Sequence, residues 1–251
     1  MDALIIAAGF GSRLSEISPS KPLTPVAGVP LIELGVRQAA AAGAGRVVVV
    51  TGHEADRLEA FLPGLSQRAR IEVVAERLTD WSTPNGYSVM AGAARIAAMG
   101  GSDFLLMMAD HIFSAPVLAG LAKVGAADRG VTLGIDRAID SPLIDPDDAT
   151  WVATDERGFI RKIGKTITGF DAVDVGAFLA TQELPAAIAE AIAAGKSGSL
   201  SDGMQVLADR GRAATHDIGG AWWMDVDDPR AHALAEAEAP ANLPEIYSCV
   251  C

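Results

Sequence analysis

Glycines, a guanidinium group and an ammonium group follow the first apolar segment of the chain. This segment reads LIIAAGFGSRL, and KPL follows it at 21–23. Gly9 and Gly11 lack Cβ atoms, so an anion can approach the backbone N–H groups closely there. Arg13 adds a planar fork for phosphate oxygens, and Lys21 adds a mobile point charge. These residue types at this spacing predict a cradle for phosphate groups, with a plain structural turn as the alternative.

Two other phosphate-binding motifs do not fit the sequence. A dinucleotide fingerprint needs a third glycine at the position of Leu14. The GKS at 195–197 would be part of a P-loop only with a glycine where Glu190 stands, and an Ala-rich helical segment precedes it instead of a strand. The predicted anion site therefore rests on the first 23 residues.

Carboxylates occur at two strand-like segments far along the chain. Asp110 ends the apolar run FLLMMAD, and Asp225 and Asp227 stand two apart in WWMDVDD, where a strand would turn both to one side. Open α/β sheets bind ligands at the carboxyl ends of their strands, and hard divalent cations prefer carboxylate oxygens. Each aspartate alone is compatible with a cap or a solvated edge. Together with Arg13 and Lys21 they predict a magnesium site opposite the anion cradle.

Polar residues in three further segments could contact a substrate. PNGYS at 84–88 opens a helix, and its side chains could read a base edge or a ribose, or simply cap that helix. KIGK at 162–165 and FDAVDVGAF at 170–178 bring a lysine and two aspartates into the second half of the chain, where a solvated strand and turn is the alternative. The candidates are Asn85, Gly86, Ser88, Lys165, Asp171 and Asp174.

The elements that must position these residues alternate between strand and helix. We expect strands at 3–7, 46–51, 70–75 and 104–109, and helices at 31–42, 55–62 and 87–99. This predicts an α/β fold with a mostly parallel mixed sheet flanked by helices. After residue 130, short strands at 130–135, 150–154, 159–163 and 172–179 predict a partly antiparallel extension, followed by helices at 183–194 and 201–210, strands near 213–217 and 221–226, and a helix from 229.

Composition limits the partners and the setting. The 251 residues carry a net charge of −12, which disfavours nucleic acid and anionic membranes as partners. Apolar runs are too short to cross a bilayer and no signal peptide is visible, so we expect a cytoplasmic protein without membrane insertion. We expect one domain at 1–240, with halves at about 1–130 and 131–228, and a tail at 241–251. Cys249 and Cys251 fall in that tail, where metal binding, lipidation and a redox contact are alternatives to a frayed end.

The order of these motifs from residue 7 to about 228 resembles that of the CTP:inositol-1-phosphate cytidylyltransferases. The opening AAGFGSRL and KPL resemble nucleotidyltransferases in general. ADH followed by an aromatic residue and Ser, then IGK, VD-x-G and WMDVD, are more specific to the cytidylyltransferases. The resemblance implies a Rossmann-like fold of GT-A type and a Mg²⁺-dependent transfer of CMP from CTP to inositol-1-phosphate, giving CDP-inositol for phospholipid synthesis, and pyrophosphate.

The resemblance also implies roles for single residues. Arg13 and Lys21 would be the catalytic cations, acting on the α-phosphate and the leaving pyrophosphate. The nucleotide would contact Ala7, Ala8, Gly9, Gly11, Ser12, Asn85, Gly86 and Ser88. Mg²⁺ would be held by Asp110 with Asp225 or Asp227, and the acceptor by Lys165, Asp174 and Asp171. His111 is expected to support the site rather than to bind magnesium, which seldom takes imidazole.

Other functions stay open at this point. A phosphocholine or aminoalkylphosphonate cytidylyltransferase would share the loop, and an aromatic cage for a quaternary ammonium could come from Trp81, Tyr87, Trp222 and Trp223. A sugar-1-phosphate nucleotidyltransferase is a further alternative. A catalytically silent nucleotide-binding module would not need the cations and the aspartates together. The family is often fused to a membrane-bound transferase domain that this sequence lacks, so we expect a separate downstream CDP-alcohol transferase; a homodimer stays open.

Overall fold

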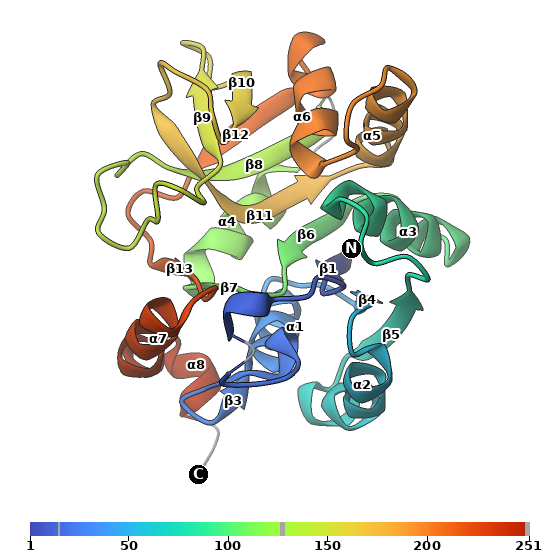
Figure 1. Cartoon of the computed structure of the whole chain (residues 1–251), viewed down its shortest axis with the longest axis vertical. Coiled ribbons are helices and arrows are strands. Elements are labelled where there is room, and N and C mark those ends of the chain that lie inside the picture. Colours follow the sequence, from blue (N-terminus) through green and yellow to red (C-terminus); the bar gives the residue numbers. More distant parts are fainter. Residues whose placement is uncertain (15, 126–128, 249–251) are drawn as a thin grey trace.

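A parallel sheet forms the first half of the computed structural model, which describes residues 1–14, 16–125 and 129–248. Cys249 and Cys251 lie outside the described residues. The strands are β1 (Asp2–Ile6), β4 (Arg46–Thr51), β5 (Glu72–Arg77) and β6 (Phe104–Met108), in the spatial order β6-β1-β4-β5. Helices α1 (Leu31–Ala41), α2 (Ala55–Ala69) and α3 (Asn85–Ala98) connect them, as the alternating pattern predicts (Figure 1).

Helices cover both faces of this sheet, so its strands are apolar on both sides. In β1, Leu4 and Ile6 belong to a core shared with α3, whereas Ala3 and Ile5 belong to a core shared with α1 and α2. All four side chains are buried. The continuous apolar runs of the sequence follow from this two-sided burial.

The second half continues the same sheet with antiparallel pairing. β11 (Ala172–Ala180) runs antiparallel to β6 and joins the parallel strands to the remainder of a nine-stranded sheet. The other members are β8 (Val131–Asp136), β9 (Trp151–Thr154), β10 (Ile160–Gly164) and β12 (Ala213–Asp217), with α5 (Glu183–Ala193) and α6 (Leu200–Asp209) packed on one face. The predicted mixed sheet with a partly antiparallel extension is confirmed.

The C-terminal part returns to the start of the chain. β13 (Trp223–Asp225) pairs with β7 (His111–Phe113), and α7 (Pro229–Asn242) and α8 (Pro244–Tyr247) pack beside the hairpin of β2 (Pro25–Val26) and β3 (Val29–Pro30) (Figure 1). Tyr247 donates a hydrogen bond to the Val26 carbonyl at 2.8 Å, and Ile246 is buried. The expectation of a tail from residue 241 is therefore wrong for 241–248, because apolar residues near the end of the chain complete a third core.

Further elements differ from expectation. Helix α2 continues through Pro63 to Ala69, because Leu65 extends the buried stripe of Leu58 and Leu62. Helix α4 (Ala115–Val124) and strand β7 were not expected, since both are short and lie next to a turn. Within the described ranges, no helix is long and apolar enough to cross a membrane.

Helix α3 approaches the sheet closely at Gly92. A Cβ atom there would lie 2.1 Å from Leu4 Cδ1 and 2.9 Å from Val50 Cγ2. We expect Gly92→Ala to lower the free energy of unfolding by about 1–3 kcal/mol through overpacking. Gly64→Ala in α2 is the matched control, because its Cβ would meet only the end of the flexible Arg68 side chain. Urea unfolding measures both, and equal stabilities for the two variants would contradict this packing.

Candidate active site

Two adjoining cavities open at the carboxyl edge of the parallel strands. One, of about 360 Å³, is lined by the loop after β1 and is named here the glycine-loop cavity. The other, of about 420 Å³, lies under the 137–150 segment and is named the acidic cavity. Both are lined by the same five residues at their boundary: Arg13, Asn85, Met108, Asp110 and Asp227. The carboxyl edge is where open α/β sheets bind ligands.

Lys21 lies at the centre of this boundary. Its Nζ atom donates to Asp110 Oδ2 at 2.6 Å and also to Asp227 Oδ1, and only 10% of its side chain is exposed. Burial alone would lower the pKa of Lys21, but the charges of Asp110, Asp225 and Asp227 outweigh it and raise that pKa. Burial likewise acts to raise the pKa of Asp110, but Lys21 and the neighbouring His111 hold it well below its usual range. The ammonium group of Lys21 and the carboxylate of Asp110 are therefore both charged, whereas burial raises the pKa of Asp227.

Gly11 permits this arrangement. It precedes the short helix η1 (Ser12–Leu14) and has a φ of +59°, which favours glycine. A Cβ atom at Gly11 would lie 2.5 Å from the Cβ of Lys21, which begins η2 (Lys21–Leu23). The glycine thus leaves space for the lysine side chain to pass beneath the loop.

Asp148 connects two further cations of the site, Arg13 and Lys165. Its carboxylate accepts hydrogen bonds from Arg13 and from Lys165, and Arg13 also donates to Asp227. Lys165 is 57% exposed at the mouth of the acidic cavity. Asp148 was missed by sequence reasoning, because DPDD in an irregular segment reads as a solvated turn. Only the tertiary fold brings it against residues from both ends of the chain.

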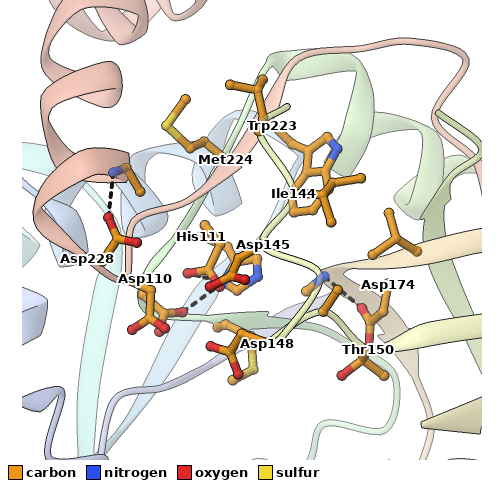
Figure 2. A pocket seen from close by; sticks show the side chains of 18 of the residues that line it. Asp110, His111, Ile144, Asp145, Asp148, Thr150, Asp174, Trp223, Met224 and Asp228 are labelled. Carbon is orange, nitrogen blue, oxygen red and sulfur yellow. Dashed lines mark hydrogen bonds and ion pairs between the residues drawn. The ribbon is translucent and has the colours of Figure 1, made fainter. Parts of the chain in front are cut away.

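His111 connects the carboxylates on the other side of the cavity (Figure 2). Its Nδ1 lies 2.8 Å from Asp110 Oδ1 and 3.7 Å from Asp225 Oδ1, and its ring stacks on Trp223 at 6.2 Å between centroids. Burial acts to lower the pKa of His111. The charge of Asp225 and the hydrogen bond to Asp110 outweigh this effect and raise the pKa of His111 to about 9. The imidazole therefore carries a positive charge and orients Asp110, which agrees with its expected supporting role.

Two half-buried carboxylates face this imidazolium. Burial raises the pKa of Asp174 to about 6, although the Gly176 N–H, 2.7 Å away, and His111 favour its charged form. Burial also raises the pKa of Asp225 to about 7, against the attraction of His111. Gly176 has a φ of +75°, and a Cβ atom there would lie 2.4 Å from His111 Cδ2, so only glycine fits below the ring.

Asp171 and Gly86 do not lie where the sequence placed them. Asp171 accepts hydrogen bonds from the N–H and hydroxyl groups of Thr154 at 2.7 and 2.6 Å and from Arg137 at 2.5 Å, and it lines neither cavity. Asp171 was expected to contact the acceptor, but in the structure it forms an ion pair with Arg137 outside both cavities. A Cβ atom at Gly86 would lie 2.2 Å from the Gly198 carbonyl oxygen, so Gly86 permits close packing of α3, and it lines neither cavity.

The other residues expected to bind a nucleotide surround the glycine-loop cavity. Ala7, Ala8, Gly9, Gly11 and Ser88 line it, and the backbone of Ser12 begins η1. Asn85 lines both cavities, and its Oδ1 accepts from the Leu200 N–H at 2.8 Å. That bond fixes the amide orientation and leaves the Nδ2 donors for a ligand.

Several oxygen atoms at the boundary could hold a divalent cation. Oxygen or nitrogen atoms of Asp110, His111 and Asp225 lie within 4.8 Å of one another, as do those of Asp148, Asp225 and Asp227. Asp225 Oδ1 is buried without a hydrogen-bond partner in the described part of the chain. An orphaned carboxylate oxygen beside further carboxylates fits a hard cation such as Mg²⁺.

The four aromatic residues considered for a cage do not converge. Trp81 lines the glycine-loop cavity and Trp223 the acidic cavity. Trp222 donates to Glu238 at 2.9 Å, and the Tyr87 ring packs near Gly198. A cage for a quaternary ammonium built from all four is thereby excluded.

The MobA-like NTP transferase domain family matches residues 3–144. The chain belongs to this family. A bifunctional IPC transferase and DIPP synthase of Rubrobacter xylanophilus is 32% identical over 93% of this chain, and this chain covers 51% of that protein. A CMP-5'-(3-aminopropyl)phosphonate synthase of Streptomyces rubellomurinus is 30% identical over 90% of this chain and 37% of that protein. The chain thus spans about half the length of the Rubrobacter protein and a smaller share of the length of the Streptomyces protein.

The solved structure of the inositol-1-phosphate CTP transferase from T. maritima superimposes on this chain with a TM-score of 0.78. The match covers 93% of this chain and 94% of that chain at 23% identity, which supports the GT-A-like fold. Family and relatives together identify this chain as a nucleotidyltransferase.

The imidazolium of His111 predicts a pH dependence of stability. Because the folded protein binds this proton more tightly than the unfolded chain does, the contribution is complete below pH about 6.5 and is lost as pH rises through about 9. Between pH 7.5 and 9 we expect the metal-free protein to lose about 2 kcal/mol of unfolding free energy through His111. Urea unfolding in EDTA measures this loss, and His111→Gln should lack it. If the unfolding free energy of His111→Gln fell with pH as steeply as that of the wild type, His111 would be excluded as the source of the loss.

Proposed function

We propose that this nucleotidyltransferase transfers CMP from CTP to inositol-1-phosphate in a Mg²⁺-dependent reaction, forming CDP-inositol and pyrophosphate. The observation that carries the proposal is the convergence of Arg13, Asp110 and Asp227 at the boundary of two cavities, with Lys21 donating hydrogen bonds to both carboxylates. A reaction between two phosphorylated substrates needs such a shared boundary, with one substrate on each side. The names of the Rubrobacter and Streptomyces relatives support cytidylyl transfer to a phosphorylated or phosphonate acceptor.

The charge of the site supports the requirement for a divalent cation. Aspartates outnumber lysines and arginines around the two cavities: Asp110, Asp145, Asp148, Asp174, Asp225, Asp227 and Asp228 against Arg13, Lys21, Lys165 and Arg230. Two polyanions would be repelled by this surface unless further positive charge were present. Asp110, Asp225 and Asp227 would hold Mg²⁺, which supplies charge neutralisation at the phosphate oxygens.

The chain's own residues position the reactants and stabilise charge. The acceptor phosphate is already an anion at neutral pH, so the nucleophile needs no general base. Arg13 and Lys165, which share Asp148 in this structure, exchange that carboxylate for phosphate oxygens of the two substrates. Lys21 neutralises charge that develops on the leaving pyrophosphate. Catalysis then rests on orientation and electrostatics.

The acidic cavity is the proposed acceptor site. Asp174 (Figure 2) and Lys165 both line this cavity, so the Asp174 carboxylate can accept hydrogen bonds from polyol hydroxyls. The same surplus of carboxylates would also suit an ammonium group, and a relative is named for an aminopropylphosphonate product. An aminoalkylphosphonate is therefore the second candidate acceptor. We further propose that the enzyme acts in the cytoplasm and that a membrane-bound CDP-alcohol transferase consumes its product.

A substrate panel tests the proposed function. Pyrophosphate release is measured with Mg²⁺ for CTP, UTP, GTP and ATP, each against inositol-1-phosphate, phosphocholine, 2-aminoethylphosphonate and glucose-1-phosphate. We expect the highest kcat/KM for CTP with inositol-1-phosphate, and no turnover in EDTA. Release only with 2-aminoethylphosphonate would select the second candidate. Release only with UTP and glucose-1-phosphate would overturn cytidylyl transfer.

Replacement of Lys21 tests its proposed catalytic role. We expect Lys21→Ala to lower kcat by about 10²–10³, the usual effect of removing one group that stabilises transition-state charge. Lys196→Ala, at an exposed lysine after α5, is the matched control and should retain wild-type turnover. Circular dichroism establishes that both variants are folded, because Lys21 is also the counterion of Asp110. A kcat within about threefold of wild type would remove Lys21 from the mechanism.

A further inference from the structure

Three aromatic side chains from three separate loops meet at the edge of the glycine-loop cavity. Phe10 stands between Gly9 and Gly11, His53 follows β4, and Trp81 follows β5. Ring centroids lie 4.6 Å apart for Phe10 and His53, 5.0 Å for His53 and Trp81, and 6.3 Å for Phe10 and Trp81. We name these three residues the aromatic rim. They adjoin because β1, β4 and β5 are neighbouring parallel strands whose carboxyl ends share one edge.

Trp81 is the member of the aromatic rim that lines the cavity. Its Cβ lies over Gly52, where an added Cβ atom would be 2.5 Å from Trp81 and 2.8 Å from Ala8. Gly52 therefore lets the Trp81 segment lie directly against the start of the glycine loop. His53 meets the indole edge-on at 74°, and Phe10 is stacked at 28°. Trp81 nevertheless keeps 39% of its surface exposed.

The charges of the cavity decide which part of a nucleotide meets this indole. Arg13 and Asp110 line both cavities, and Lys21 donates a hydrogen bond to Asp110 from the glycine-loop cavity, so a triphosphate and its metal would find their partners there. Trp81, Thr83 and Ser88 line the same cavity but not the acidic one. A nucleotide whose phosphates lie at the cations therefore directs its base toward Trp81.

We propose that Trp81 binds the nucleotide base by stacking, and that Phe10 and His53 are positioning residues that hold the indole in place. This inference rests on the proposed function for the identity of the nucleotide as CTP. Phe10 also belongs to the loop that cradles the phosphates, and the His53 N–H donates to the Ala8 carbonyl at 3.0 Å. Base stacking and the conformation of the glycine loop are thereby linked through the aromatic rim. Because every base has a π face, stacking on Trp81 contributes to nucleotide affinity but not to selectivity between bases.

Binding of CTP and of inorganic tripolyphosphate, each with Mg²⁺, separates base contact from phosphate contact. We expect Trp81→Ala to raise the Kd for CTP by about 5- to 100-fold, the range for loss of one base–aromatic stack, and to leave the Kd for tripolyphosphate unchanged. Trp81→Phe should retain most of the affinity for CTP. Phe10→Ala should raise the Kd for CTP less than Trp81→Ala does. Isothermal titration calorimetry measures each Kd.

Tryptophan fluorescence gives a second readout that a purely structural role would not change. CTP should quench the wild type and Trp222→Phe, whose indole lies outside the glycine-loop cavity, but should quench Trp81→Phe markedly less. Wild-type affinity of Trp81→Ala for CTP, an equal loss for tripolyphosphate, or undiminished quenching in Trp81→Phe would each overturn the inference. If another nucleotide binds and quenches through Trp81 while CTP does not, the stacking role stands and the proposed cytidylyl transfer fails.

Discussion

The ion pair of Lys21 with Asp110 and Asp227 is the interaction on which the rest of the site depends. It joins the loop after β1, the end of β6 and the segment after β13 at one ammonium group. A buried charge is costly unless it is paired, so these residues stabilise one another only in this arrangement. The surrounding structure is built to keep them together. Gly11 leaves space for the lysine stem, and His111 orients the second oxygen of Asp110.

The same pairing explains why the C-terminal segment packs against the N-terminal loop. Asp227 lies just before α7, and α7 and α8 close a separate core with the β2–β3 hairpin that follows Lys21. The boundary between the two cavities is thus supported from both ends of the chain. In a nucleotidyltransferase this rigidity has a purpose, because reaction between two anions depends on groups that are already in position when the substrates arrive.

The surplus of carboxylates is the second constraint. The half-buried carboxylates of Asp174 and Asp225 beside His111 have raised pKa values, and the acidic residues around the cavities outnumber the lysines and arginines. An additional positive charge would stabilise such a site, which is consistent with the proposed magnesium ion. It is also consistent with the proposal that Arg13 and Lys165 exchange Asp148 for substrate phosphate. In the proposed reaction, backbone and aromatic surface of the glycine-loop cavity would contact the nucleotide, and carboxylates and Lys165 of the acidic cavity would contact the acceptor.

The sequence by itself determined the sheet and the chemical character of the site. Continuous apolar runs separated by helical periodicity can be satisfied only by a covered parallel sheet, and the residues that follow such strands must share its carboxyl edge. That reasoning placed Arg13, Lys21, Asp110, Asp225 and Asp227 together, and the structure agrees. Residue pattern could not identify Asp148, the packing role of Gly86, or the ion pair that occupies Asp171. Those depend on which irregular segments meet across the molecule, and only long-range packing decides such contacts.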